Sequence, residues 1–277
     1  MGLKLFDFQK EAVKRALNIR NMLLCVRVGG GKTMIAMVYA KNLLKKNMTD
    51  KVIFACTVSA AVAVRGEFQE KGNIEVPQYE KVDDFIDWLR SDKKICVIKH
   101  SMFEKLGYDQ NVIDELRQIW EERELRVTLI IDEAHKLSNW QGVAHTAYLN
   151  IKFLFDRVML MTATPYASCL SQLFGTIHLI NQQLWKNARA FFRDHIEEQT
   201  IMVNGRVARK EKIAYKNLKE LREKIAPFTY FYYPKIKLNF FDHKVTLKDY
   251  SEYDEICKGV LTAKELEKLN GKDSKND

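Results

Sequence analysis

Short apolar runs alternate with amphipathic segments over the first 180 residues of the chain. The apolar runs have the composition of strands buried on both faces, and the segments between them repeat apolar residues at the spacing of a helix. We predict strands at 22–28, 52–57, 95–99, 127–131 and 157–162. We predict helices at about 8–19, 33–46, 59–71, 82–90, 110–123 and 143–152. This alternation predicts an α/β fold in which helices cover both faces of a mostly parallel sheet.

The pattern changes beyond residue 180. Residues 201–207 centre on Asn204-Gly205, a pair typical of a type I′ hairpin turn. The helical stretches and strand-like runs predicted around this turn are 183–198, 215–226, 228–233 and 238–246. We therefore expect three regions: a first lobe of alternating strands and helices at 1–182, a helical and hairpin extension at 183–262, and a polar tail or linker at 263–277.

A glycine run follows the first predicted strand and leads into the next predicted helix. It consists of Gly29, Gly30 and Gly31, followed by Lys32 and Thr33. Glycines allow backbone N–H groups to surround phosphate oxygens, and the helix N-terminus adds partial positive charge. A lysine at this position reaches the β and γ phosphates, and the adjacent hydroxyl can bind Mg²⁺. The run is therefore a candidate phosphate-binding loop.

An acidic string follows the fourth predicted strand, where residues 132–135 read Asp-Glu-Ala-His. One carboxylate at a strand end can hold a divalent cation, and a second can orient or deprotonate a water molecule. A structural alternative, with no catalytic role, is that Asp132 and Glu133 cap the helix that follows. The glycine run and the acidic string, in this order, predict a P-loop nucleoside-triphosphatase.

Composition narrows the class of partner. The formal charge of +9 favours a polyanionic partner, although the basic residues of 206–224 could simply form a solvated helix face. The five cysteines are scattered without a Cys-x-x-Cys pair, as expected of small core residues in a reducing compartment. The longest mostly apolar stretch, 52–64, is too short to span a membrane. We expect an intracellular protein, cytoplasmic or nucleoid-associated.

Further motifs, in the same order along the chain, complete a resemblance to the first RecA-like lobe of superfamily-two helicases and translocases. Within these, the chain looks most similar to the Swi/Snf-type translocases of double-stranded DNA. The motifs are Gln9 within 5–11, the glycine run at 29–33, Cys56-Thr57, the segment 98–101, the DEAH box at 132–135 and the segment 161–165. The match extends from about residue 3 to residue 262.

The resemblance implies a RecA-like fold that binds ATP and Mg²⁺ and hydrolyses ATP. In this family pattern Gln9 reads the edge of the adenine, and Thr33 and Asp132 hold Mg²⁺. Glu133 polarises the attacking water, and His135 couples the nucleotide to the segment 161–165. The implied role of the glycine run and Lys32 is to bind the phosphates.

The resemblance also implies a nucleic-acid partner, expected to be duplex DNA held by its backbone. Thr57, Ser101 and Thr164 are the implied contacts. Arg206 and Arg209, beside the predicted hairpin turn, are candidates for further contacts if the hairpin acts as a wedge or a groove-contacting finger. A plain surface hairpin explains the same residues without such a function.

Two features of the chain keep alternative functions open. Ala163 stands where Swi/Snf-type translocases have glycine and many helicases have alanine, so a strand-separating DNA or RNA helicase is one alternative. The chain has no second glycine-rich start of a RecA-like lobe, which would supply an arginine to the nucleotide. We therefore expect weak hydrolysis by these 277 residues alone, with a non-catalytic half-motor as the other alternative.

Overall fold

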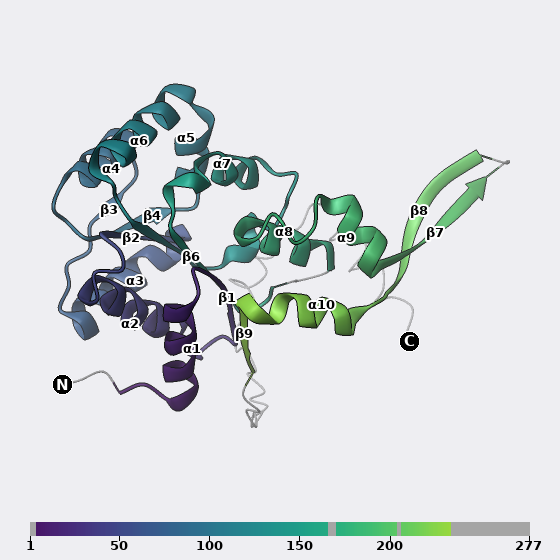
Figure 1. Cartoon of the computed structure of the whole chain (residues 1–277), viewed down its shortest axis with the longest axis horizontal. Helices are drawn as coiled ribbons and strands as arrows, with labels where there is room; N and C mark the ends of the chain where they lie inside the picture. Colours follow the sequence, from purple (N-terminus) through teal and green to yellow (C-terminus); the bar gives the residue numbers. More distant parts are fainter. Residues whose placement is uncertain (1–3, 166–169, 204–205, 234–277) are drawn as a thin grey trace, which may run out of the picture. The chain divides into compact units, whose positions relative to one another are not determined.

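A parallel sheet of seven strands forms the centre of the fold in the computed structural model (Figure 1). The structure describes residues 4–165, 170–203 and 206–233, all within one compact unit of the chain. The strand order is β3-β4-β2-β5-β6-β1-β9, and every pairing in this sheet is parallel. The strands are β1 (Asn21–Val26), β2 (Lys51–Cys56), β3 (Gln78–Tyr79), β4 (Ile95–Lys99), β5 (Val127–Ile131), β6 (Arg157–Thr162) and β9 (Thr229–Tyr232).

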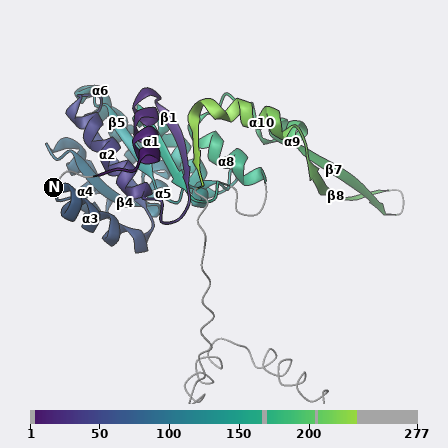
Figure 2. The same ribbon diagram turned by 90° about the horizontal axis from the view of Figure 1, so that it is seen from below.

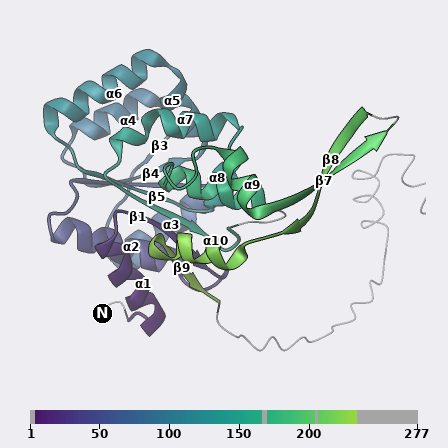
Figure 3. The same cartoon turned by 45° about the vertical axis from the view of Figure 1, so that its right-hand side comes forward.

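Helices cover both faces of the sheet, as the alternating pattern predicts. Successive strand residues belong to different cores: Leu23 packs in one apolar cluster and Leu24 in the other. One face carries α1 (Asp7–Asn18), α2 (Lys32–Lys45) and α3 (Val58–Gly72). The other face carries α4 (Val82–Arg90), α5 (Ser101–Tyr108), α6 (Gln110–Arg123), α7 (Val143–Ile151) and α8 (Leu170–Ile180), as Figure 3 shows. This is the predicted RecA-like architecture, and it is confirmed.

In the part described by the structure, the extension after residue 180 contains two helices and a separate antiparallel pair of strands (Figure 2). Its elements are α9 (Ala188–His195), β7 (Ile196–Val203), β8 (Arg206–Tyr215) and α10 (Leu218–Ile225). The hairpin is longer than predicted, because the strand begins at Ile196 and the helix predicted to run to residue 198 ends at His195. The predicted turn at Asn204-Gly205 and the predicted strand 238–246 lie outside the described residues.

Short elements complete the described chain. They are the 3-10 turns η1 (Ala134–Leu137), η2 (Lys152–Leu154) and η3 (Ala226–Phe228). Cys25, Cys56 and Cys96 are buried free thiols on the sheet, which confirms their prediction as core residues. Among the described residues, no helix combines the length and the apolar character needed to cross a membrane.

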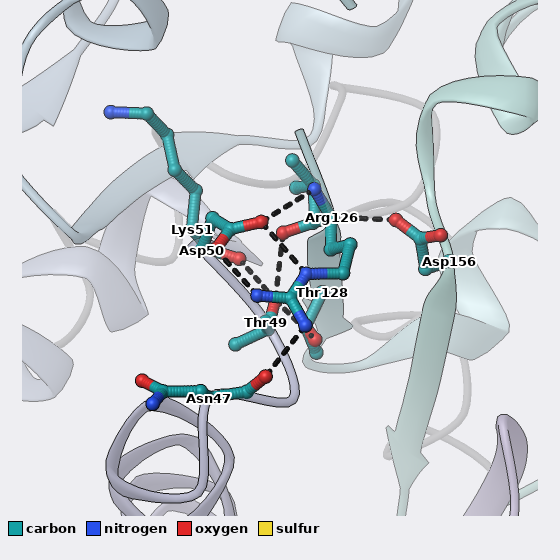
Figure 4. A network of polar contacts seen from close by, with 8 residues as sticks. Asn47, Thr49, Asp50, Lys51, Arg126, Thr128 and Asp156 are labelled. Atoms are coloured by element: carbon teal, nitrogen blue, oxygen red, sulfur yellow. Dashed lines mark hydrogen bonds and ion pairs between the residues drawn. The ribbon is translucent and has the colours of Figure 1, made fainter. Parts of the chain in front are cut away.

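A polar network fixes the amino-terminal edge of the sheet, opposite the strand ends that carry the motifs (Figure 4). Arg126 donates to both carboxylate oxygens of Asp50, at 3.0 and 2.8 Å, and to the carbonyl oxygen of Asn47 at 2.6 Å. This guanidinium lowers the pKa of the Asp50 carboxyl. The Thr128 hydroxyl donates to Thr49 at 3.0 Å within the core. The start of β5 is thereby fixed to the turn that precedes β2.

Lys51, the first residue of β2, is buried beside the end of α4. Its ammonium donates to the carbonyl oxygens of Trp88, Ser91 and Lys93 at 2.9, 2.6 and 2.9 Å. Burial lowers its pKa to about 8, so the three-donor ammonium prevails at neutral pH. It adds a charged donor to carbonyl groups at and just beyond the end of the helix, among which that of Trp88 also accepts from the N–H and the hydroxyl of Ser91 at 3.1 and 2.8 Å.

We expect Lys51→Met to lower the free energy of unfolding by about 3 kcal/mol, because several partly buried carbonyl groups lose a charged donor at once. Urea denaturation measures the change. Lys93→Met is the matched control, since the exposed Lys93 side chain leaves its carbonyl group in place. A loss below about 0.5 kcal/mol for Lys51→Met would show that water replaces the ammonium without cost.

Candidate nucleotide-binding site

The glycine run forms a tight loop between β1 and α2, and its conformation requires glycine. Gly29 and Gly31 have φ of +79° and +76°, in the left-handed region where a side chain is strained. A Cβ on Gly30 would lie 2.4 Å from Cγ1 of Val26, and one on Gly31 would lie 2.5 Å from Nε2 of Gln9. The loop therefore has the build of a phosphate cradle, because backbone rather than side chains forms it; within it the N–H of Gly30 donates to the carbonyl oxygen of Arg27 at 3.0 Å.

The N-terminus of α2 begins inside this loop. Gly31 is its N-cap and supplies no side-chain cap to the first N–H groups of the helix, which leaves them available to an anion. The Lys32 ammonium lies 3.5 Å from the carbonyl oxygen of Val26, at the long limit of a hydrogen bond. The Thr33 hydroxyl has no hydrogen bond to the residues that the structure describes. These groups fit a nucleotide phosphate with its Mg²⁺.

Gln9 joins the start of α1 to the glycine loop. Its Oε1 accepts from the backbone N–H of Phe6 at 3.0 Å, and its Nε2 donates to the carbonyl oxygen of Gly30 at 3.1 Å. The side chain is therefore a brace for the loop. A second N–H and a second lone pair of the amide remain for a ligand, so adenine recognition by Gln9 stays a prediction.

Asp132 and Glu133 follow β5, beside the glycine loop. The backbone N–H of Asp132 donates to the carbonyl oxygen of Ala55 at 2.8 Å, and Oδ1 accepts from the N–H of Glu133 at 3.0 Å. Burial and the neighbouring Glu133 raise the pKa of Asp132, while the Lys32 ammonium lowers it. Glu133 has a left-handed φ of 48° and its side chain makes no cap to η1. The Asp132 carboxylate is thus held by a backbone N–H, and the Glu133 carboxylate does not cap the following turn.

A polar chain connects this acidic string to the end of β6. Nδ1 of His135 lies 3.2 Å from Oε2 of Glu133 and 3.2 Å from the hydroxyl of Thr162. Because a carboxylate only accepts, Nδ1 carries the hydrogen in this contact. The Thr162 hydroxyl in turn donates to the carbonyl oxygen of Thr164 at 3.2 Å. The sequence separates these segments by more than 25 residues, and the fold places them in contact.

The structure brings some of the candidate nucleic-acid contacts together. Thr57 follows β2, Ser101 follows β4 and Thr164 follows β6, so all three lie at the carboxyl edge of the sheet. This is the edge at which open parallel sheets bind ligands. Thr57 also caps α3 by accepting from the N–H of Ala60 at 3.3 Å. Thr57, Ser101 and Thr164 therefore share one edge with the glycine loop and the acidic string.

The two arginines lie elsewhere. Arg206 and Arg209 belong to β8, where they pair with Val203 and Ile201 in the separate two-stranded sheet. Their register includes a bulge between Ile201 and Met202. The fold therefore does not gather them with the three residues at the carboxyl edge of the main sheet, and a role in nucleic-acid binding stays a prediction for both.

Sequence reasoning missed two residues at this edge. Nε2 of His100 is buried without a hydrogen-bond partner in the described structure, and burial lowers the pKa of its imidazole. The Tyr233 hydroxyl donates to the carbonyl oxygen of Ala163 at 2.8 Å. His100 lies within the motif segment 98–101, which is a local signal, but nothing near Tyr233 in the sequence indicates its contact with the segment 161–165.

Comparisons with known proteins identify the family of the chain. The family model described as DEAD/DEAH box helicase matches residues 6–172. A Caenorhabditis elegans homologue of SWI/SNF-related matrix-associated actin-dependent regulator of chromatin subfamily A-like protein 1 is 26% identical over 189 residues. That match covers 68% of this chain and 26% of the relative.

Solved structures of the Sulfolobus solfataricus SWI2/SNF2 ATPase core share the fold. The core in complex with dsDNA has a TM-score of 0.62 and the core domain alone has 0.59, each at 16% sequence identity. The alignments cover 84% and 85% of this chain and 45% of each solved chain. The chain thus spans about a quarter of the curated relative's length and under half of the solved cores.

The family match includes the helix that carries Gln9, the glycine loop and the acidic string, and the fold match extends beyond it. The resemblance to a first RecA-like lobe of the superfamily-two motors is confirmed by these matches. On this combination of motifs, site geometry and fold, the chain belongs to the DEAD/DEAH box helicase family.

Proposed function

We propose that the chain is the ATP-binding lobe of a Swi/Snf-like DNA motor, which binds ATP with Mg²⁺ and the backbone of duplex DNA. The observation that carries the proposal is the contact of His135 with both Glu133 and Thr162. It connects the carboxylate expected to hold the attacking water to the segment that ends at the nucleic-acid edge. A motor needs such a connection, because hydrolysis must alter its hold on the track.

Each residue of the site has a defined task in this proposal. The glycine loop and Lys32 bind the phosphates, and Thr33 and Asp132 hold the metal. Mg²⁺, when bound, neutralises phosphate charge as it develops. Glu133 accepts a hydrogen bond from the attacking water. A second RecA-like lobe is the expected partner, because an arginine from across the cleft stabilises the transferred phosphoryl group.

The rival functions share this site. A helicase that separates DNA or RNA strands is favoured by a single residue, Ala163, at a position where Swi/Snf-type translocases have glycine. Displacement of a labelled strand from a partial duplex distinguishes the two, since a translocase moves along duplex without separating it. A half-motor that binds nucleotide and regulates a partner would bind ATP but remain inactive with any second lobe.

The proposal predicts that duplex DNA binding depends on salt and hardly on sequence. Contacts with about three phosphates would lower the affinity about 40-fold between about 50 and 200 mM salt. Fluorescence anisotropy with two labelled duplexes of unrelated sequence measures both dependences. A duplex affinity that does not change with salt concentration, or that differs strongly between the two duplexes, would contradict binding to the DNA backbone.

A charge inserted at the carboxyl edge tests the location of the DNA. We expect Ser101→Asp to lower duplex affinity about three- to tenfold by repelling phosphates. The substitution places an acidic residue in the first turn of α5, where it is compatible with the helix. Asn47→Asp adds the same charge to an exposed residue at the opposite edge and should leave affinity unchanged. Equal losses for both variants would refute the assignment of this edge.

A further inference from the structure

A groove outside the nucleotide site lies between the segment after η1, helix α9 and the end of β8. It encloses a volume of about 740 Å³. We call it the aromatic–basic groove, after the residues that line it, principally Trp140, Arg189, Phe192, Arg193, Ile196 and Lys216. None of these residues takes part in the proposed nucleotide or DNA site, so the groove requires its own explanation.

The floor of the groove is apolar and well packed. The rings of Trp140 and Phe192 meet edge to face with their centroids 6.4 Å apart. Both rings also contact Phe174 of α8, at 5.9 and 6.5 Å. Trp140 and Phe192 remain only half-buried, and the neighbouring Ile196 side chain is 3% exposed. An apolar side chain placed here would therefore complete a partly covered aromatic surface.

The rim of the groove is positively charged. The side chains of Arg189, Arg193 and Lys216 are exposed beside the aromatic floor. Arg193 is neutralised by Asp194, whose Oδ1 lies 2.9 Å from its Nε. Arg189 and Lys216 form no ion pair within the described part of the chain. The groove thus offers two uncompensated cations to a ligand.

The backbone fixes the groove's walls. The N–H of Lys216 donates to the carbonyl oxygen of His195 at 3.0 Å, which ties β8 to the end of α9. Nδ2 of Asn217 donates to the carbonyl oxygen of Asp194 at 2.8 Å. At the other end of the helix, Asn187 caps α9 through the N–H of Ala190 at 3.0 Å. A groove held in this way needs little reorganisation to bind, which favours affinity.

We propose that the aromatic–basic groove docks an acidic amphipathic segment of a partner protein. An apolar side chain of that segment would pack on Trp140 and Phe192, and carboxylates on either side of it would pair with Arg189 and Lys216. Charge complementarity at the rim and the half-buried Trp140 ring at the floor select this chemistry. A phosphate backbone would satisfy the cations but would leave the apolar floor uncovered, so the groove favours protein over nucleic acid.

The groove adjoins the acidic string of the nucleotide site. Trp140 lies two residues after Ser138 in the chain. The hydroxyl of Ser138 donates to the carbonyl oxygen of His135 at 2.5 Å. Helix α8 packs so closely here that a Cβ on Gly175 would lie 1.7 Å from the carbonyl oxygen of Ser138. A segment bound over Trp140 would therefore stabilise the backbone that positions His135. This regulatory consequence rests on the proposed function, whereas the docking itself does not.

A direct binding experiment tests the docking without any hydrolysis. The probe is a fluorescein-labelled peptide of about twelve residues, with a central Leu-Trp pair flanked by Asp and Glu. We expect the double variant Arg189→Glu and Lys216→Glu to weaken its binding at least about tenfold. The double variant Lys14→Glu and Lys94→Glu, at two exposed lysines elsewhere, is the charge-matched control and should stay within about twofold.

The apolar half of the site is tested separately. Replacing the peptide's Leu-Trp pair with Ser-Ser should weaken binding at least about tenfold, since the aromatic floor is then unused. Equal binding of the two peptides, or equal losses for the two charge-reversed proteins, would overturn the proposal. The proposal would also be overturned if the double variant Arg189→Glu and Lys216→Glu bound the peptide as before but lost duplex DNA binding. The groove would then bind nucleic acid. Circular dichroism checks that each variant is folded.

Discussion

Replacing Glu133 with Gln is expected to lower ATP turnover by about 10²–10⁴-fold while leaving nucleotide binding nearly unchanged. The amide keeps the size of the side chain and can still accept a hydrogen bond from the N–H of His135. It cannot take a proton from water, so the chemical step fails. The metal is expected on Asp132 rather than Glu133, and ATP–Mg²⁺ should therefore still bind.

Phosphate release by this chain combined with a second RecA-like lobe and duplex DNA measures the turnover, and titration with a fluorescent ATP analogue measures binding. Glu121→Gln, at an exposed carboxylate of α6, is the isosteric control and should change neither quantity. If Glu133→Gln loses nucleotide binding instead, Glu133 is a metal ligand or a structural group, and the assigned role is wrong.

Replacing Lys32 with Ala is expected to weaken ATP binding by about an order of magnitude or more. The ammonium is the expected side-chain cation on the β and γ phosphates. Its long contact with Val26, 3.5 Å, holds it only weakly in the structure, so little is lost when it turns to a phosphate. The substitution also removes the cation that lowers the pKa of Asp132, which makes the carboxylate harder to ionise and adds to the loss.

Isothermal titration with ATP and Mg²⁺ measures this change. Lys45→Ala removes a lysine from the other end of the same helix and serves as the control, because it tests helix and charge effects away from the loop. If Lys32→Ala bound ATP with unaltered affinity, the phosphate-cradle assignment would be refuted. This result does not depend on the DNA-binding proposal.

The core sheet was predictable because its strands are continuous apolar runs. Strand β5 begins and ends at the predicted residues, 127 and 131. Its side chains are apolar except that of Thr128, so the strand can only be buried on both faces. The same rule fails for β3, whose two residues, Gln78 and Tyr79, are too few to show a pattern. It also fails for the start of β7, because Ile196 follows the helical run that ends at His195 without a turn signal.

The sequence by itself determined the chemistry available to this protein. A glycine run before Lys32 and Thr33 has few other physical uses, and a strand followed by Asp132 and Glu133 places carboxylates at a sheet edge. Local residue types and their spacing suffice for such inferences, because a strand end and a helix start are properties of short segments.

Only the tertiary structure decided which of these segments meet. The contact of His135 with Thr162, the brace from Gln9 to Gly30 and the groove on Trp140 all join residues at least 21 positions apart. The order of the parallel strands creates these neighbours, and strand order depends on the packing of both faces together. The same packing separates Arg206 and Arg209 from the carboxyl edge, because their strand pairs with β7 rather than with the central sheet.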